Sequence, residues 1–149
     1  MKLSLCFIGC GKWAQNVLDG TPELADNFCL FFASSNADKA REFCNTYHGE
    51  DFFDNYSTAV QDQRVKAVYF ATPHHVHLDN VKLAAREQKH VMVEKPIART
   101  AIEAESMIKM AKEASIKFMV AENYRFLNTV NKCKDLIQQN AIGDLRLIE

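Results

Sequence analysis

The sequence predicts an α/β fold with a doubly wound, mostly parallel sheet, and two observations lead to this class. Short apolar runs rich in Val, Ile, Leu or Phe recur along the chain, and most of them lack polar alternation. Strands that are buried on both faces of a parallel sheet have this composition. Helical patterns separate the runs, and the β-α-β-α-β order predicts parallel strands joined by right-handed crossovers.

Five apolar runs are the expected strands, and a sixth segment is a shorter candidate. The five runs are Leu3–Ile8, Phe28–Ala33, Ala67–Ala71, His90–Val93 and Lys117–Ala121. The shorter candidate is Asp51–Phe53. No internal repeat, low-complexity stretch or long linker interrupts the sequence, so we expect these strands to belong to one sheet.

The helices between the strands are predicted from the spacing of apolar residues. Val81, Ala84 and Ala85 indicate the buried side of a helix over residues 76–88. Two other segments carry apolar residues at i, i+3, i+4 and i+7, which places them on one helix face. These are Ala40, Phe43, Cys44 and Tyr47 in the first segment, and Ala104, Met107, Ile108 and Ala111 in the second. A capping box formed by Thr100 and Glu103 predicts where the helix of the second segment begins.

Composition and charge narrow the class of protein. The 149 residues suffice for one domain with a real core, and 48% apolar with 25% charged residues is ordinary for a globular protein. A net charge of -1 offers no electrostatic footprint for nucleic acid or for an anionic membrane surface. We therefore expect neither of them as a partner.

The five cysteines indicate a reducing compartment. None belongs to a Cys-x-x-Cys pair, so neither a zinc site nor a redox dithiol is indicated. An odd number of scattered cysteines fits reduced thiols, and we expect a cytoplasmic location. The apolar run Leu3–Ile8 is too short for a signal peptide or a membrane span and fits a buried first strand.

A glycine motif directly follows the first predicted strand. Residues 9–14 read Gly9-Cys10-Gly11-Lys12-Trp13-Ala14, the GxGxxA form of the dinucleotide-binding fingerprint. Gly9 permits a tight turn, Gly11 lets a pyrophosphate approach the backbone, and Ala14 permits close packing of helix on strand. The helix that begins here offers free N–H groups and a partial positive charge. This context predicts a Rossmann domain that binds a nicotinamide cofactor, and a glycine turn without a ligand is the alternative.

The end of the second predicted strand bears on the choice of cofactor. It reads Ser34-Ser35-Asn36-Ala37-Asp38-Lys39. An NAD-selective fold usually carries an acidic residue here for the ribose 2′-OH, whereas hydroxyl and amide groups together with Lys39 suit a 2′-phosphate. We expect NADP(H) to be preferred and NAD(H) to be possible. The alternative is that Ser35 or Asn36 only caps the next helix.

Three histidines follow the third long strand, in the segment Ala71-Thr72-Pro73-His74-His75-Val76-His77. Thr72 and Pro73 predict a rigid turn at the crevice. His74 and His77 then lie on the first helical turn, where they either face the ligand or cap the helix. Only Asp79 could join them as a further metal ligand, so we expect no metal site.

Two further polar segments follow the last predicted strands. Glu94-Lys95-Pro96 places a lysine where it can donate to a substrate oxygen or lower the pKa of a hydroxyl about to lose its proton. The alternative is a surface lysine paired with Glu94. The last segment is Glu122-Asn123-Tyr124-Arg125-Phe126. The glycine motif and the four polar segments all begin at the carboxyl end of a predicted parallel strand, where ligands bind in open α/β sheets.

These motifs resemble those of the N-terminal domain of the glucose–fructose oxidoreductase/inositol dehydrogenase family, also written Gfo/Idh/MocA. The matching pieces are the glycine motif, Ala71-Thr72-Pro73 with His77, Glu94-Lys95-Pro96, and Asn123-Tyr124-Arg125-Phe126. The segment Ile142-Gly143-Asp144-Leu145 is similar to the family's entry into its second domain. The resemblance covers essentially the whole chain, and Glu-Lys-Pro is its most specific part.

The resemblance implies the cofactor-binding domain of an NADP(H)-dependent oxidoreductase that acts on a sugar, a polyol or a related hydroxyl or carbonyl compound. Lys95 and Tyr124 are the implied catalytic residues. Together with the motifs above, it predicts cofactor contacts by Gly9, Cys10, Gly11, Lys12, Trp13, Ser34, Ser35, Asn36, Lys39, Ala71, Thr72, Pro73, His74, His77, Glu94, Lys95, Asn123 and Arg125. A second domain in family members supplies the substrate pocket and most of the dimer interface, so a homo-oligomer is implied for a full-length protein.

The last part of the sequence predicts the start of a further domain. Residues 126–139 have a helical pattern, Asn140–Gly143 a turn, and Leu145–Ile148 a new apolar strand. We therefore expect a dinucleotide-binding domain over residues 1–123, and a connecting helix with the first strand of an absent domain over residues 124–149. The alternative is a stand-alone cofactor-binding or sensing module without catalysis.

Overall fold

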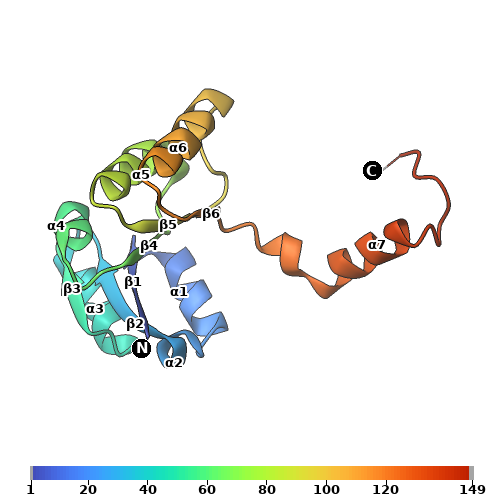
Figure 1. The fold of residues 1–149 in the computed structure, drawn as a ribbon. Helices are drawn as coiled ribbons and strands as arrows, with labels where there is room; N and C mark the ends of the chain where they lie inside the picture. Colours follow the sequence, from blue (N-terminus) through green and yellow to red (C-terminus); the bar gives the residue numbers. More distant parts are fainter. Residues whose placement is uncertain (1, 148–149) are drawn as a thin grey trace.

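Six parallel strands form the central sheet of the computed structural model, which describes residues 2–147 (Figure 1). In their order across the sheet they are β3 (Asp51–Phe53), β2 (Phe28–Ala33), β1 (Leu3–Ile8), β4 (Ala67–Phe70), β5 (His90–Val93) and β6 (Phe118–Val120). Leu5 of β1 is in register with Leu30 of β2 and with Ala67 of β4. The strand order reverses between β1 and β4, so the carboxyl ends of β1, β2 and β4 border one crevice.

Helices cover both faces of this sheet. One face carries α1 (Lys12–Gly20), α2 (Leu24–Asn27) and α3 (Ala37–Thr46), and the other carries α4 (Tyr56–Gln61), α5 (His77–Arg86) and α6 (Ala101–Glu113) (Figure 1). Side chains of β1 alternate between the two layers. Leu5 and Phe7 pack in the cluster that contains Ala14 of α1, whereas Cys6 and Ile8 pack in the cluster of α4, α5 and α6. The doubly wound parallel sheet predicted from the sequence is therefore confirmed.

The predicted elements agree with the structure except at their limits. Asp51–Phe53 is a strand, as the shorter candidate predicted. The strands predicted over residues 67–71 and 117–121 are each shorter, at Ala67–Phe70 and Phe118–Val120. The helix expected over residues 76–88 consists of a short 3-10 turn, η1 (His74–Val76), followed by α5.

Two details at α6 correct the sequence prediction. Ile108, expected on the buried face, is 41% exposed, whereas Met107 and Ala111 of the same helix are buried. The Thr100 hydroxyl accepts from the Glu103 N–H at 3.2 Å, as a capping box requires. The Glu103 carboxylate, however, accepts from the N–H and guanidinium of Arg99 instead of from the Thr100 N–H. The arginine competes successfully because a charge-assisted pair is stronger than a bond to a neutral N–H.

The carboxyl-terminal segment extends away from the sheet (Figure 1). It consists of the 3-10 turn η2 (Asn123–Phe126) and helix α7 (Asn128–Gln138), and within the described chain no residue of α7 is buried. The strand predicted over Leu145–Ile148 is not formed by residues 145–147, and Ile148 lies outside the described residues. A strand needs a neighbour for its N–H and C=O groups, and these residues have none within residues 2–147.

Lys89 joins two loops at the end of the sheet opposite the crevice, where β4 and β5 begin. Its side chain is buried, and its Nζ donates to the carbonyl oxygens of Asp62 at 2.9 Å and Val65 at 2.8 Å. Burial lowers the pKa of this ammonium group. The two carbonyl groups therefore hold the buried cation and fix the segment between α4 and β4.

We predict that Lys89→Ala lowers the free energy of unfolding by about 2 kcal/mol, because two buried carbonyl groups lose their donor. Urea denaturation followed by circular dichroism measures this loss. Lys82→Ala is the matched control, since Lys82 is exposed on α5 and its removal leaves no buried group unsatisfied. Equal unfolding free energies for the two variants would contradict the assigned role of Lys89.

Candidate cofactor site

The turn after β1 can be built only around a glycine at position 9. Gly9 has φ +103°, and its N–H donates to the Ala33 carbonyl of β2 at 2.9 Å. A Cβ at this position would lie 2.8 Å from the Ala71 carbonyl oxygen. Both the backbone conformation and the close approach of the β4 loop therefore require glycine, as the sequence motif predicted.

Gly11 provides a different property, which is open space in front of a helix. It is the N-cap of α1, and no atom in the described chain lies within 4 Å of the position its Cβ would occupy. Among residues 2–147 no side chain caps α1, and its first turn contains no acidic residue. By contrast, Asn36, Asn55 and Thr100 cap α3, α4 and α6 with their own side chains. The uncapped N–H groups of α1 form a site that suits an anion such as a pyrophosphate.

Cys10 and Lys12 flank this anion site differently. The Cys10 side chain is buried and faces the Ala33 carbonyl, with Sγ and oxygen 3.6 Å apart. Burial raises the pKa of the Cys10 thiol to about 12, so the group is neutral at physiological pH. Cys10 can therefore offer a ligand only its backbone. Lys12 is exposed and its Nζ donates to Gln15 at 3.1 Å.

The loop after β2 uses two of its polar side chains to shape itself. The buried Ser34 Oγ accepts from the Asn36 N–H at 3.1 Å, and Asn36 Oδ1 accepts from the Lys39 N–H at 3.2 Å. Asn36 therefore caps α3, which was the alternative interpretation of this residue. The side chains of Ser35 and Lys39 are exposed beside the crevice and can contact a ligand.

Tyr56 is a neighbour of this loop that the sequence analysis missed. It begins α4 after the end of β3, and the Ser35 side chain lies near enough to its hydroxyl to lower its pKa slightly. Burial is the main cause that raises the Tyr56 pKa, so the hydroxyl keeps its proton. The signal in the sequence was weak, because a lone tyrosine 21 positions after Ser35 forms no motif.

The loop after β4 separates the three histidines. His77 is fully buried, and its Nε2 and Nδ1 lie 2.8 Å from the Thr72 carbonyl oxygen and 3.1 Å from that of Ile97. The expectation that His77 faces the ligand is thus corrected, because its ring lies beneath the loops and joins them. His74 is exposed, and Thr72 is buried with its hydroxyl accepting from Asn80 at 3.0 Å. In the described part of the chain, no group of three His, Cys, Asp or Glu side chains could hold a metal ion.

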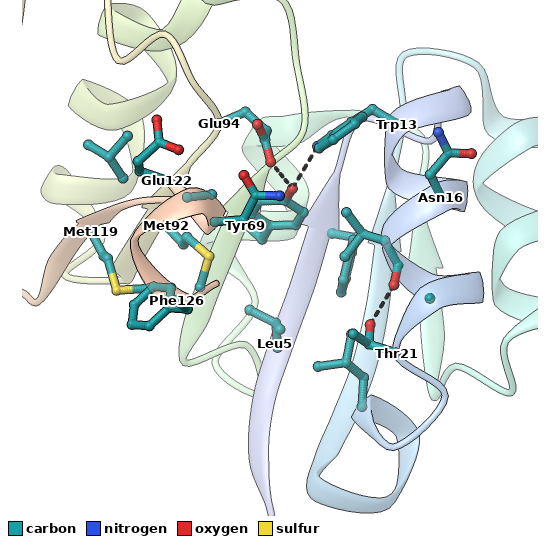
Figure 2. A pocket seen from close by; sticks show the side chains of 17 residues that line it. Leu5, Trp13, Asn16, Thr21, Tyr69, Met92, Glu94, Met119, Glu122 and Phe126 are labelled. Atoms are coloured by element: carbon teal, nitrogen blue, oxygen red, sulfur yellow. Dashed lines mark hydrogen bonds between the residues drawn. The ribbon is translucent and has the colours of Figure 1, made fainter. Parts of the chain in front are cut away.

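Lys95 and Glu94 belong to a network with two aromatic residues, and Figure 2 shows its Glu94, Tyr69 and Trp13 side chains. The Trp13 Nε1 donates to the Tyr69 hydroxyl at 3.2 Å, and this hydroxyl donates to Glu94 Oε1 at 2.5 Å. Glu94 Oε2 accepts from the Lys95 backbone N–H at 3.0 Å. The Lys95 Nζ lies 5.6 Å from the centre of the Trp13 ring, a cation–π distance.

Glu94 is therefore not the salt-bridge partner of Lys95, which was the alternative interpretation. Glu94 is buried and both of its oxygens accept other bonds, whereas Lys95 is exposed. No salt bridge joins the Lys95 ammonium group to a carboxylate within residues 2–147. A cation held over an aromatic ring and free of a carboxylate can donate to a ligand oxygen.

The segment after β6 is largely exposed to solvent. Asn123 lies near the network, but Tyr124 is 65% exposed on η2, and Arg125 is also exposed. The Tyr124 N–H donates to Glu122 Oε1 at 3.2 Å. The Tyr124 side chain is therefore mostly exposed to solvent in this structure, and its catalytic role stays a prediction.

An apolar groove of about 430 Å³ lies below the network, between α1 and the sheet (Figure 2). Its walls include Phe7 and Met92 from the strands and Val17 from α1, and Phe126 of η2 borders it. Trp13 and Glu94 stand at its upper end, where the groove meets the crevice. The network thus separates a polar ligand site from an apolar surface of the sheet.

Taken together, the glycine turn, the uncapped helix and the parallel sheet define a dinucleotide-binding Rossmann domain. A sequence model of one protein family, described as "Oxidoreductase family, NAD-binding Rossmann fold", matches residues 3–122. The chain belongs to this family, Gfo/Idh/MocA, and the resemblance inferred from the motifs is confirmed. None of the helices described within residues 2–147 is long and apolar enough to cross a membrane.

Individual relatives are dehydrogenases of small hydroxyl compounds. Levoglucosan dehydrogenase of Pseudarthrobacter phenanthrenivorans is 34% identical over 111 residues, which cover 74% of this chain and 28% of that protein. Trans-1,2-dihydrobenzene-1,2-diol dehydrogenase of Xenopus tropicalis is 26% identical over 123 residues. The match covers 83% of this chain and 37% of that protein. A solved structure of levoglucosan dehydrogenase with NADH and levoglucosan superimposes with a TM-score of 0.84 at 28% identity, over 96% of this chain and 41% of that chain. The chain thus spans less than half the length of these relatives.

We predict that Gly11→Val abolishes binding of both NADPH and NADH and leaves the fold intact. A valine fits the open space at position 11 but occupies the place where a pyrophosphate would approach α1. The fluorescence of Trp13, the only tryptophan in the chain, serves as the binding signal. Gly20→Val at the other end of α1 is the control, because its surroundings are equally open. A folded Gly11→Val protein that still binds cofactor would show that this loop is not the phosphate site.

Proposed function

We propose that this chain is the cofactor-binding domain of an NADP(H)-dependent oxidoreductase that acts on a sugar, a polyol or a related hydroxyl or carbonyl compound. The observation that carries the proposal is the uncapped N-terminus of α1 behind Gly11, with the exposed Lys95 ammonium group at the same end of the sheet. The first feature suits a pyrophosphate, and the second suits a substrate oxygen. The sugar and diol substrates named for the relatives support the substrate class.

The preference for NADP(H) rests on the loop after β2. No carboxylate stands at positions 34–36, where an acidic side chain would repel a 2′-phosphate. Asp38 is the nearest acidic residue, and it pairs with Arg41 at 3.8 Å. The exposed Lys39 ammonium group and the Ser35 hydroxyl are the donors available to the phosphate.

Lys95 is the residue we assign to proton transfer. The bound nicotinamide would supply the hydride acceptor or donor. Lys95 would hold the substrate oxygen with its ammonium group, stabilise negative charge that develops on that oxygen, and donate or accept the proton there. The Trp13 ring beneath the ammonium group keeps the cation at the crevice without neutralising it.

Two further proposals concern the whole protein. The five free cysteines fit a reducing environment, and we infer a cytoplasmic location. The exposed apolar side chains of the segment after β6, Phe126, Leu127, Val130 and Ile137, support a homo-oligomer or a further domain for a longer protein. A stand-alone cofactor-binding module without catalysis is the competing function.

We predict that the wild-type chain binds NADPH more tightly than NADH and that Lys39→Ala weakens NADPH binding alone. The loss is about 1–2 kcal/mol, the contribution of one charge-assisted hydrogen bond. Isothermal titration calorimetry with both cofactors measures it. Lys134→Ala, which removes an equal charge on the distant α7, serves as the control. Equal wild-type affinities for NADPH and NADH would refute the preference.

We also predict that this 149-residue chain binds cofactor but does not turn over polyols or aldoses. Positioning of two reactants can lower a barrier by about 7–11 kcal/mol, and Lys95 alone offers one contact to a substrate. Reduction of NADP⁺, followed by absorbance over a substrate panel, tests this expectation. Turnover by the chain that disappears in Lys95→Ala would show instead that the domain is a complete enzyme.

A further inference from the structure

Tyr69 has a buried ring that contacts a neighbouring aromatic ring, and its hydroxyl lies at the crevice. It lies on β4, is 4% exposed, and its ring meets that of Phe7 edge to face at 5.0 Å. Its hydroxyl accepts from Trp13 of α1 and donates to Glu94 after β5, so one oxygen atom links the two side chains by hydrogen bonds (Figure 2). The start of α1 and the segment after β5 are therefore both attached to β4 through this hydroxyl.

The chemistry of the partners decides which way each proton points. An indole N–H only donates, so the Tyr69 oxygen accepts from Trp13. The hydroxyl proton is then left for Glu94, whose carboxylate only accepts. Burial, followed by the bond to Glu94, raises the pKa of Tyr69, so this proton stays on the phenol. The network has one consistent direction, from Trp13 through Tyr69 to Glu94.

This direction has a consequence for Lys95. Because Tyr69 occupies Oε1 of Glu94, the carboxylate turns Oε2 toward the backbone N–H of Lys95. The main chain at Lys95 is thereby held, and the carboxylate is not available to its ammonium group. The same hydroxyl holds the Trp13 ring, over which the ammonium group lies. Both the base of the Lys95 side chain and the surface beneath its tip therefore depend on Tyr69.

We propose that Tyr69 is a positioning residue for Lys95, holding its backbone through Glu94 and its ammonium group through the ring of Trp13. The inference rests on the proposed function only in that Lys95 is the residue that meets the substrate. The position of Lys95 itself can be measured without cofactor or substrate.

The experiment measures where the Lys95 side chain lies relative to the Trp13 ring. Lysines of the full chain are dimethylated with ¹³C-formaldehyde, which keeps their charge, and the Lys95 signal is assigned from its absence in Lys95→Arg. We expect an upfield shift of this signal in the wild-type protein, caused by the ring current of Trp13. In Tyr69→Phe we expect the signal to move to the position of an exposed lysine, while the Lys39 signal stays in place.

Tyr47→Phe is the matched control for a lost hydroxyl. The Tyr47 hydroxyl donates to Asp19 Oδ1 at 2.7 Å, away from the crevice. We expect this variant to lose stability without moving the Lys95 signal. If Tyr69 had only a structural role, Tyr69→Phe would also lower stability without moving the Lys95 signal. A shift of the Lys95 signal in Tyr69→Phe alone therefore shows that Tyr69 positions Lys95.

A second variant covers the case in which Tyr69→Phe does not fold. Glu94→Gln keeps the size of the side chain but offers one neutral acceptor oxygen in place of two, so either Tyr69 or the Lys95 N–H loses its acceptor. We expect the Lys95 signal to move in this variant as well. An unchanged Lys95 signal in folded Tyr69→Phe, or in Glu94→Gln if Tyr69→Phe is unfolded, would overturn the inference. Failure of the wild-type chain to bind NADPH would instead overturn the proposed function and leave the result for Tyr69 standing.

Discussion

The close approach of the turn after β1 to the loop after β4 is the constraint on which the candidate site depends. Gly9 lies against the Ala71 carbonyl with no room for a Cβ, and its N–H bonds to the last residue of β2. Three strand ends therefore meet at one glycine. Because α1 begins immediately after this turn, its N-terminus points over the same crevice. Any residue larger than glycine would separate the β1 and β4 loops and move the helix with them.

Polar groups at this end of the sheet divide into those that build the loops and those that remain available. Four of them bond to groups of neighbouring loops and helices and give the crevice its shape: Ser34, Asn36, Thr72 and His77. Lys39, Lys95 and the first N–H groups of α1 remain available to a ligand. A rigid loop scaffold with a few free donors is what tight and oriented binding requires, because little order has to be created when the ligand arrives.

The two faces of the sheet differ in how much apolar surface they leave exposed. The face with α4, α5 and α6 is packed with apolar side chains, whereas the groove beside α1 leaves Met92 of the sheet partly exposed. Trp13 and Tyr69 stand at the boundary between this groove and the polar crevice. Their ring faces are apolar and their N–H and O–H groups are polar, so each satisfies both environments at once.

The sequence by itself determined the parallel sheet, the glycine turn and the lysine after β5, because strand runs, GxGxxA and Glu-Lys-Pro are local patterns. It did not determine which polar side chains face a ligand. His77 has the spacing of a ligand-facing residue but is buried between two backbone carbonyls, and the Tyr124 side chain is 65% exposed. Trp13, Tyr69 and Glu94 form one network although 56 and 25 residues separate the bonded pairs. Only the tertiary structure decided these roles, because the order of strands in the sheet brings such distant residues together and no local pattern records it.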